Sequence, residues 1–313
     1  MDIHAGARIA RYELSDARSV VARGGKHKGS SARTRRTKRK SSVRSGVSGN
    51  ASGCLGIIGC PILEDEIVHS VQRDSDISNV FVIENEDSRN LLRKLRRADT
   101  KANIASVNEG DLDRTKEEGF SLLILMKSMA LHEDPKVLRK EVARGVELIG
   151  PYCRSIMLFY GLCGNAFQHL SEVEEETGRR LTLVTDEQGR PVDDCIAAVL
   201  GGTDGYYRLL KRYPGVFYLT PAWAENWRDL IFKMEMTRGV SKGDLRMLKW
   251  MFETAGYRKA LMIDTVLGQG DEFEERALDF AKEFKFELAT LEREFITLDA
   301  VDRSYDRAKR ICK

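Results

Sequence analysis

From Cys54 onward, short apolar runs of strand length alternate with amphipathic stretches of helical length. Most of the runs are continuously apolar, as strands buried on both faces of a parallel sheet are. Helical stretches of about 10 to 15 residues between strands are typical of βαβ units. The pattern predicts an α/β fold, with a mainly parallel sheet and helices on both faces, but no strand order. The expected strands are 55–59 within the apolar run 55–63, 80–85, 120–126, 155–161, 181–185, 216–220, 260–265 and 286–291.

Length and composition restrict the class of protein. A chain of 313 residues, 42% of them hydrophobic, can form one large domain or two small ones with a sizeable core. No run of about 18 apolar residues occurs, so we expect no membrane span. The N-terminus lacks the apolar centre of a secretory signal, and six cysteines are too few for a disulfide scaffold. We therefore expect a cytoplasmic protein with reduced thiols, where clustered cysteines more often serve metal binding or catalysis.

Residues 1–53 differ from the rest of the chain in charge. They carry 13 Lys and Arg against 3 Asp and Glu, whereas residues 54–313 carry 38 against 45. Large apolar residues are nearly absent from 24–53, which predicts a disordered basic tail at 1–53 ahead of an α/β domain at 54–313. Such an arm could bind nucleic acid through its phosphates. We favour a solvated tail, or translation from a start codon upstream of the natural one, because the domain pattern begins abruptly at Cys54. No aromatic residues lie among the basic ones, which argues against specific binding of single strands.

Three cysteines and one histidine follow predicted strands. Cys60 lies at the end of the first strand, and His132 lies shortly beyond the strand 120–126. Cys163 follows the strand 155–161, and Cys195 begins the helix after the strand at 181–185. In open parallel sheets, ligands bind beyond the carboxyl ends of the strands. We therefore predict that these four side chains are the ligands of one metal site.

The identity of the metal stays open at this level. Three Cys and one His suit tetrahedral zinc by ligand type, and three thiolates with an open position suit iron, including an iron–sulfur cluster. Cys163 and Cys195 are expected near helix N-termini, which lower the pKa of a thiol. As alternatives, each cysteine is a small buried apolar residue, and His132 caps the next helix. For Cys54, Cys153 and Cys312, we expect either buried packing or no particular role.

Other residues at the strand ends are weaker candidates. Asp194 is a candidate general acid or base, although paired acids such as Asp193 and Asp194 are also common at helix starts. The turn at 161–165 could offer backbone N–H groups to an anion, and Trp223 could form the wall of a pocket or simply pack in the core. The candidate cofactor-binding residues are therefore Gly161, Gly164, Asn165 and Trp223.

At these positions the chain resembles the DUF1638 family, an uncharacterised prokaryotic domain found in methanogenic archaea and some bacteria. The similarity covers about residues 55–235 and implies that Cys60, His132, Cys163 and Cys195 form the family's polar core. It brings no established reaction. Members are similar to proteins encoded among methyltransferase and corrinoid genes, which implies a link with one-carbon metabolism. The motifs that carry the resemblance are Gly59-Cys60, Leu131-His132 with Pro135, Tyr160 to Asn165, Asp193 to Ile196 and Tyr218 to Pro221.

We therefore expect a cytosolic α/β protein with a Cys/His site for zinc or iron at the ends of its strands. The resemblance adds methyl-transfer or corrinoid chemistry as the expected context, with a corrinoid as a candidate cofactor. The expected partners are a small molecule, or a corrinoid or methyltransferase protein. The alternative is a non-catalytic accessory module that binds a cofactor or a partner. The sequence leaves open whether the protein is an enzyme.

Overall fold

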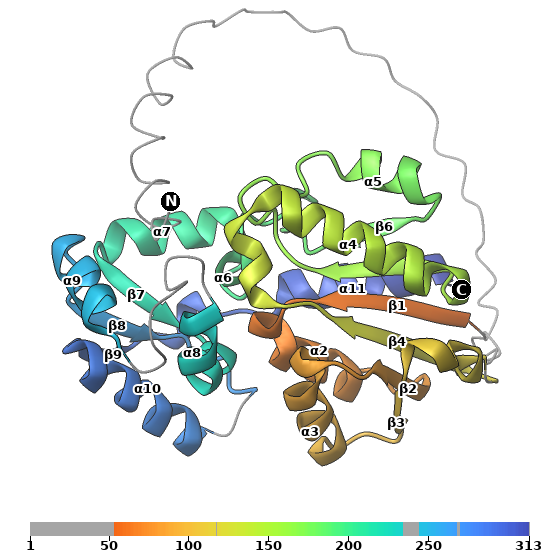
Figure 1. The fold of residues 1–313 in the computed structure, drawn as a ribbon, viewed down its shortest axis with the longest axis horizontal. Coiled ribbons are helices and arrows are strands. Elements are labelled where there is room, and N and C mark those ends of the chain that lie inside the picture. The colour runs from red at the N-terminus through yellow and green to blue at the C-terminus, as the bar shows by residue number, and fades with distance from the viewer. Residues whose placement is uncertain (1–52, 117, 234–243, 268–269, 313) are drawn as a thin grey trace, which may run out of the picture. The chain divides into compact units, whose positions relative to one another are not determined.

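The computed structural model describes residues 53–116, 118–233, 244–267 and 270–312 (Figure 1). Within these ranges, the side chains of residues 132, 133, 233, 270 and 271 are not described. All described residues belong to one compact unit, Ala51–Lys313. The predicted basic tail lies outside the described residues except for Gly53.

Six parallel strands form the first sheet, in the order β3-β2-β4-β1-β5-β6. Every residue of β4 and β5 is buried, which agrees with their continuously apolar sequences. Gly59 at the end of β1 lies opposite Met126 of β4 and Phe159 of β5, so three neighbouring strands end at the same edge. The strands are β1 (Gly53–Gly59), β2 (Ile77–Ile83), β3 (Asn103–Val107), β4 (Phe120–Met126), β5 (Ser155–Phe159) and β6 (Leu181–Leu183).

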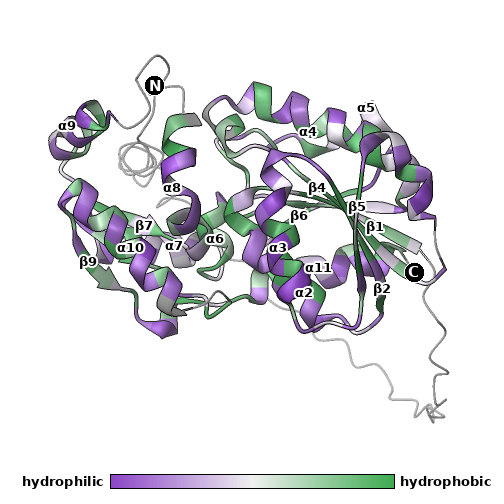
Figure 2. Cartoon of the chain, turned by 60° about the horizontal axis from the view of Figure 1, so that its bottom comes forward, coloured by the Kyte–Doolittle hydropathy of each residue, from purple (hydrophilic) through white to green (hydrophobic). Residues whose placement is uncertain are grey.

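Helices cover both faces of the first sheet, as predicted. Figure 2 shows α4 and α5 on one side of the apolar strands, and α2 and α11 on the other. Pro135 is the first residue of α4, and the Asp134 carboxylate accepts the backbone N–H groups of Lys136 and Val137 at 2.9 and 3.2 Å. This N-cap confirms that α4 begins where its proline indicated. The helices are α2 (Glu64–Arg73), α3 (Arg89–Arg97), α4 (Pro135–Ile149), α5 (Leu170–Thr177) and α11 (Asp299–Cys312).

A second parallel sheet of three strands, in the order β7-β8-β9, follows in the chain. Its core is aromatic: the Phe280 ring centroid lies 4.8 Å from those of Phe217 and Phe284. The last three predicted strands therefore form a sheet of their own rather than extending the first one. Its elements are β7 (Val216–Leu219), α8 (Pro221–Lys233), α9 (Arg246–Thr254), β8 (Lys259–Met262), α10 (Gly270–Phe284) and β9 (Glu287–Thr290).

Between the two sheets, the chain passes through α6 (Cys195–Ala198) and α7 (Thr203–Arg212). After β9 it returns to the first sheet, where α11 packs on β5, β6 and β1. Across the ranges that the structure describes, no helix is both long and apolar enough to cross a membrane.

Candidate functional site

The end of β1 brings Cys60 to the end of β5. Cys60 directly follows β1, and its backbone N–H donates to the carbonyl of Phe159 over an N···O distance of 3.4 Å. Tyr160 is the next residue after Phe159, so Cys60 and Tyr160 leave neighbouring strands at the same edge. The side chain of Cys60 is buried, with 4% exposed.

A second set of backbone hydrogen bonds brings Cys163 to Cys195. The N–H of Leu162 donates to the Val192 carbonyl at 2.8 Å, and that of Cys163 donates to the Asp193 carbonyl at 2.9 Å. Glycine is needed at 161, because a Cβ there would lie 2.7 Å from backbone atoms of Asp194. The two segments therefore pack main chain against main chain, with Cys163 beside the start of α6.

Three consecutive residues of this turn have a left-handed backbone: Cys163, Gly164 and Asn165, with φ of 45°, 65° and 71°. For a residue other than glycine, such a conformation costs on the order of 1–3 kcal/mol. The next helix, α5, begins only at Leu170, and the residues between Cys163 and His169 lie largely in turns. The prediction that Cys163 lies near a helix N-terminus is therefore wrong; it lies in a strained turn.

The thiols of Cys60, Cys163 and Cys195 meet at this edge of the sheet. Hydrogen-bonding interactions with the Cys163 thiol, then with the Cys60 thiol, and then burial raise the pKa of Cys195 well above its usual value. The expected lowering of this pKa is thus wrong. The helix α6 is only four residues long, and the Asp194 carboxylate already accepts the N–H of Ala197 at 2.8 Å, so the neighbouring thiols and burial dominate.

Tyr160 places a buried hydroxyl beside these thiols. Its oxygen has no hydrogen-bond partner among the described residues. Burial raises its pKa well above the usual value, and the sulfurs of Cys60, Cys163 and Cys195 raise it further. Its ring packs on Phe167, with the centroids 5.5 Å apart. The sequence did not indicate Tyr160 as a polar site residue, because it lies inside an apolar run.

Asp194 is the N-cap of α6, as its place at a helix start allowed. The residue is partly buried. Burial is the main cause that raises its pKa to about 6; the charge of Asp193 also raises it, while bonds from Ala197 and Tyr206 lower it. Asp193 accepts a hydrogen bond from the Tyr207 hydroxyl at 2.8 Å. A carboxyl with this pKa can accept or donate a proton near neutral pH.

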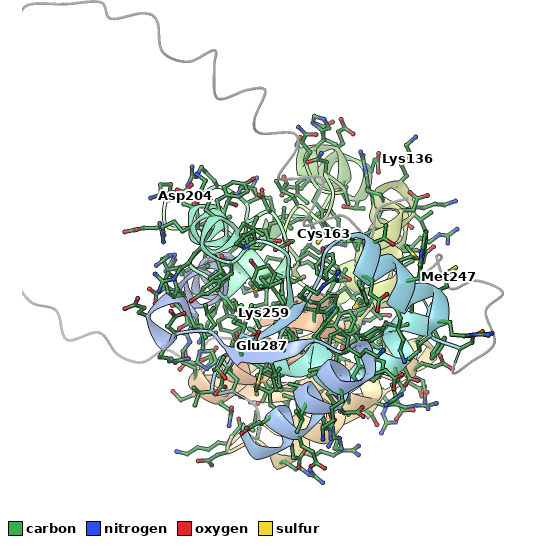
Figure 3. The ribbon with its side chains drawn as sticks, turned by 90° about the vertical axis from the view of Figure 1, so that its left-hand side faces the viewer. Lys136, Cys163, Asp204, Met247, Lys259 and Glu287 are labelled. Carbon is green, nitrogen blue, oxygen red and sulfur yellow. The ribbon has the colours of Figure 1, made fainter. Side chains whose placement is uncertain are left out.

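The remaining predicted site residues lie around the same core. Trp223 is partly buried and contacts the apolar cluster that contains Cys60 and Tyr160, against which Cys163 and Cys195 also pack. Its ring also packs on Phe217 of the second sheet, at 5.1 Å between centroids. Figure 3 labels Cys163 near the middle of the view, among the side chains drawn as sticks.

The backbone of His132 lies in a 3₁₀ turn, η4 (Met129–Glu133), directly after β4. Its predicted ligand role lies outside the described residues, because its side chain is not described. Of the side chains that are described, no three Cys, His, Asp or Glu are arranged so that they could hold a metal ion. The thiols of Cys60, Cys163 and Cys195 are therefore neighbours, but among the described side chains they do not form a preformed ligand cage.

Sequence reasoning missed a buried acidic group in the first turn of α2. Glu64, Asp65 and Glu66 are at most 3% exposed, and one carboxylate oxygen of each has no hydrogen-bond partner among the described residues. Burial is the main cause that raises the pKa of Glu64 to about 7 and that of Glu66 to about 8. Acidic residues at a helix start usually lie in solvent, where they interact with the helix dipole. In the sequence, only the position of these three residues between two apolar runs indicated that they are buried.

Lys94 of α3 partly compensates the negative charge of the carboxylates around it. Its Nζ lies 2.9 Å from Glu64, 2.7 Å from Asp65 and 3.0 Å from Glu225 of α8. Burial lowers the pKa of Lys94, but the three carboxylates together raise it above its ordinary value. The group borders a cleft of about 200 Å³ between α2 and α3 of the first sheet and α8 and α10 of the second.

Two comparisons with known proteins complete the description. The family model described as "Protein of unknown function (DUF1638)" matches residues 126–301. The sequence motifs predicted a similarity over about residues 55–235. The family match instead begins after Gly59-Cys60 and extends beyond residue 235. A search of curated proteins found no match.

Proposed function

The chain belongs to the DUF1638 family of proteins of unknown function, and from that premise we propose that Cys60, Cys163 and Cys195 form a binding site for zinc or iron. The supporting observation is that the Cys195 thiol interacts with those of Cys163 and Cys60, which come from two other βα connections. Thiolates are the ligands that structural zinc and iron–sulfur clusters take. Metal binding would displace the three thiol protons, so uptake is expected to increase with pH.

In this proposal the fourth zinc ligand is His132, because η4 follows β4, and β4 ends level with β1. An iron–sulfur cluster held by the three thiolates would instead leave one position open to a substrate. Should the protein be an enzyme, Asp194 is the proposed proton acceptor for a water or thiol held there, since its pKa of about 6 suits proton transfer near neutrality. We place this site in the cytoplasm, where thiols stay reduced.

Elemental analysis of protein purified without oxygen and without added metal tests the proposal. We expect about one equivalent of zinc, or about three to four of iron for a cluster. Cys163→Ser should lose most of the metal. The matched control Cys153→Ser, at the opposite end of the strands, should keep it. Cobalt(II) added to the reduced protein gives a second measurement, through thiolate absorption bands. Less than about half an equivalent of any of these metals, with no cobalt–thiolate bands, would refute the site.

A second candidate function is a non-catalytic module that binds a cofactor or partner. It is favoured by Trp223, which is partly buried against the same apolar cluster as the thiols, and by the left-handed turn at 163–165. The resemblance to proteins encoded among methyltransferase and corrinoid genes makes a corrinoid the first ligand to test. Mixing the protein with cobalamin should then shift the cobalamin spectrum and lead to co-elution. Neither effect would be seen if the corrinoid part of this proposal is wrong.

A further inference from the structure

The other three cysteines gather at the opposite edge of the first sheet. Cys54 is the second residue of β1, Cys153 precedes β5, and Cys312 ends α11. The sequence assigned all three to buried packing. The structure instead divides the six cysteines into two groups, one at each end of the central strands β1 and β5.

Cys54 and Cys153 form a close pair within this second group. Their Sγ atoms lie 3.8 Å apart. The Arg154 N–H donates to the Cys54 carbonyl at 2.9 Å, which holds the start of β1 beside the entry to β5. The S–S bond of a disulfide is about 2.05 Å long. The two sulfurs therefore need to approach by less than about 2 Å to form one, a distance that side-chain rotation covers.

Cys312 is engaged elsewhere. Its Sγ lies 3.0 Å from the Ser155 hydroxyl oxygen, and its thiol donates to the Cys54 carbonyl at 3.6 Å rather than to a sulfur. Burial raises the pKa of the Cys312 thiol, and its side chain is 1% exposed. The geometry thus favours a pair over a triplet.

The two members of the pair differ in access. Cys54 is partly exposed, whereas Cys153 is buried. Hydrogen bonding with Cys54 and then burial raise the pKa of Cys153 well above its usual value. Because the thiolate is the nucleophile, and an oxidant must reach it, Cys54 is the sulfur that reacts first.

We propose that Cys54 and Cys153 form a peroxide-sensitive pair, distinct from the proposed metal site. The Cys54 thiolate attacks one oxygen of a hydroperoxide, the O–O bond breaks, and Cys54 becomes a sulfenic acid. The other oxygen takes up the thiol proton and leaves as water or an alcohol. The Cys153 sulfur then attacks the Cys54 sulfur; the S–S bond forms, the S–O bond breaks, and the hydroxyl leaves as water with the Cys153 proton. The pair loses two electrons and the peroxide gains them, and a dithiol reverses the change.

Mass spectrometry of the oxidised full-length chain tests this assignment. The protein is treated with hydrogen peroxide, its free thiols are blocked with iodoacetamide, and it is digested without a reductant. Trypsin leaves Cys54 and Cys60 in the peptide 45–73 and Cys153 alone in 145–154. Fragment ions from cleavage between residues 54 and 60 therefore identify the linked sulfur. We expect a Cys54–Cys153 link that dithiothreitol removes.

Matched variants separate the pair from its neighbours. Cys312→Ser and Cys60→Ser should keep the link, whereas Cys153→Ser should leave Cys54 as a sulfenic acid that dimedone labels. A link from Cys54 to Cys312 or Cys60, or a wild-type Cys54 that is over-oxidised without a link, would overturn the proposal. Metal content in Cys153→Ser is a separate readout, so failure of the metal site and failure of the thiol pair are distinguishable.

Discussion

Tyr160 carries a buried hydroxyl at the point where three thiols meet. A buried polar group without a partner costs about 1–3 kcal/mol, and within the described part of the chain its oxygen has no partner. Proteins keep such groups where a ligand or ordered water completes them. The Tyr160 hydroxyl is therefore a further polar group beside the three cysteines. The sequence did not indicate it, because Tyr160 lies in an apolar run.

The first prediction follows from that hydroxyl. Tyr160→Phe keeps the ring contact with Phe167 and should raise the free energy of unfolding of the metal-free protein by about 1 kcal/mol. Tyr305→Phe is the matched control, because that buried hydroxyl donates to Asp74 at 2.7 Å, and its loss should lower stability by about 1 kcal/mol. Urea unfolding curves measure both. Equal destabilisation by the two variants would show that Tyr160 has a partner in the folded protein.

At the scale of elements, continuous apolar runs predicted the central strands well, because burial on both faces excludes polar residues. The edge strand β3 is only partly buried, so its residues form no continuous apolar run that would predict it. The helix α11 was also missed, since its apolar positions are mixed with many charged residues. The rule that strand ends meet at one edge led us to group Cys60 with Cys163 and Cys195, and the Cys195 thiol interacts with the other two. The turn that holds Cys163 depends on main-chain contacts with residues 192–194, which no local pattern shows.

The start of α2 makes stability depend on pH. Burial raises the pKa of Glu66 to about 8 and of Glu64 to about 7, both from an ordinary value of 4.5. At a pH between the ordinary pKa and the raised pKa, the unfolded chain has released protons that the folded chain keeps. The free energy of unfolding therefore falls as pH rises from about 5 to 8. Glu66→Gln should remove part of this fall, roughly 2 to 4 kcal/mol. Urea unfolding at several pH values measures it, with the exposed Glu86→Gln as control; parallel curves for wild type and Glu66→Gln would contradict the prediction.

For the molecule as a whole, the thiol pair links stability to oxidation. A Cys54–Cys153 disulfide would join the start of β1 to the entry of β5 and close a loop of about 100 residues. By restricting the unfolded chain, it should raise the free energy of unfolding by about 2–4 kcal/mol. Urea midpoints measured after peroxide treatment, with and without dithiothreitol, give the difference. Cys153→Ser should show none, and an equal response in that variant would place the effect on other thiols.

Lys94 gives the stability of the molecule a second dependence on pH, because its ion pairs connect the two sheets. Its amine contacts Glu64 and Asp65 beside the first sheet and Glu225 beside the second, and its side chain is 18% exposed. Lys94→Met would leave buried carboxylates without this positive charge, which should cost roughly 3–5 kcal/mol at pH 8. The loss should be smaller at pH 5, because Glu64 and Glu66, with pKa values of about 7 and 8, are then protonated in the folded protein. Lys116→Met is the matched control: its pair with Asp113 is exposed, so the change should have little effect on stability at either pH. A loss for Lys94→Met that does not change between pH 5 and pH 8 would mean that the buried carboxylates titrate normally.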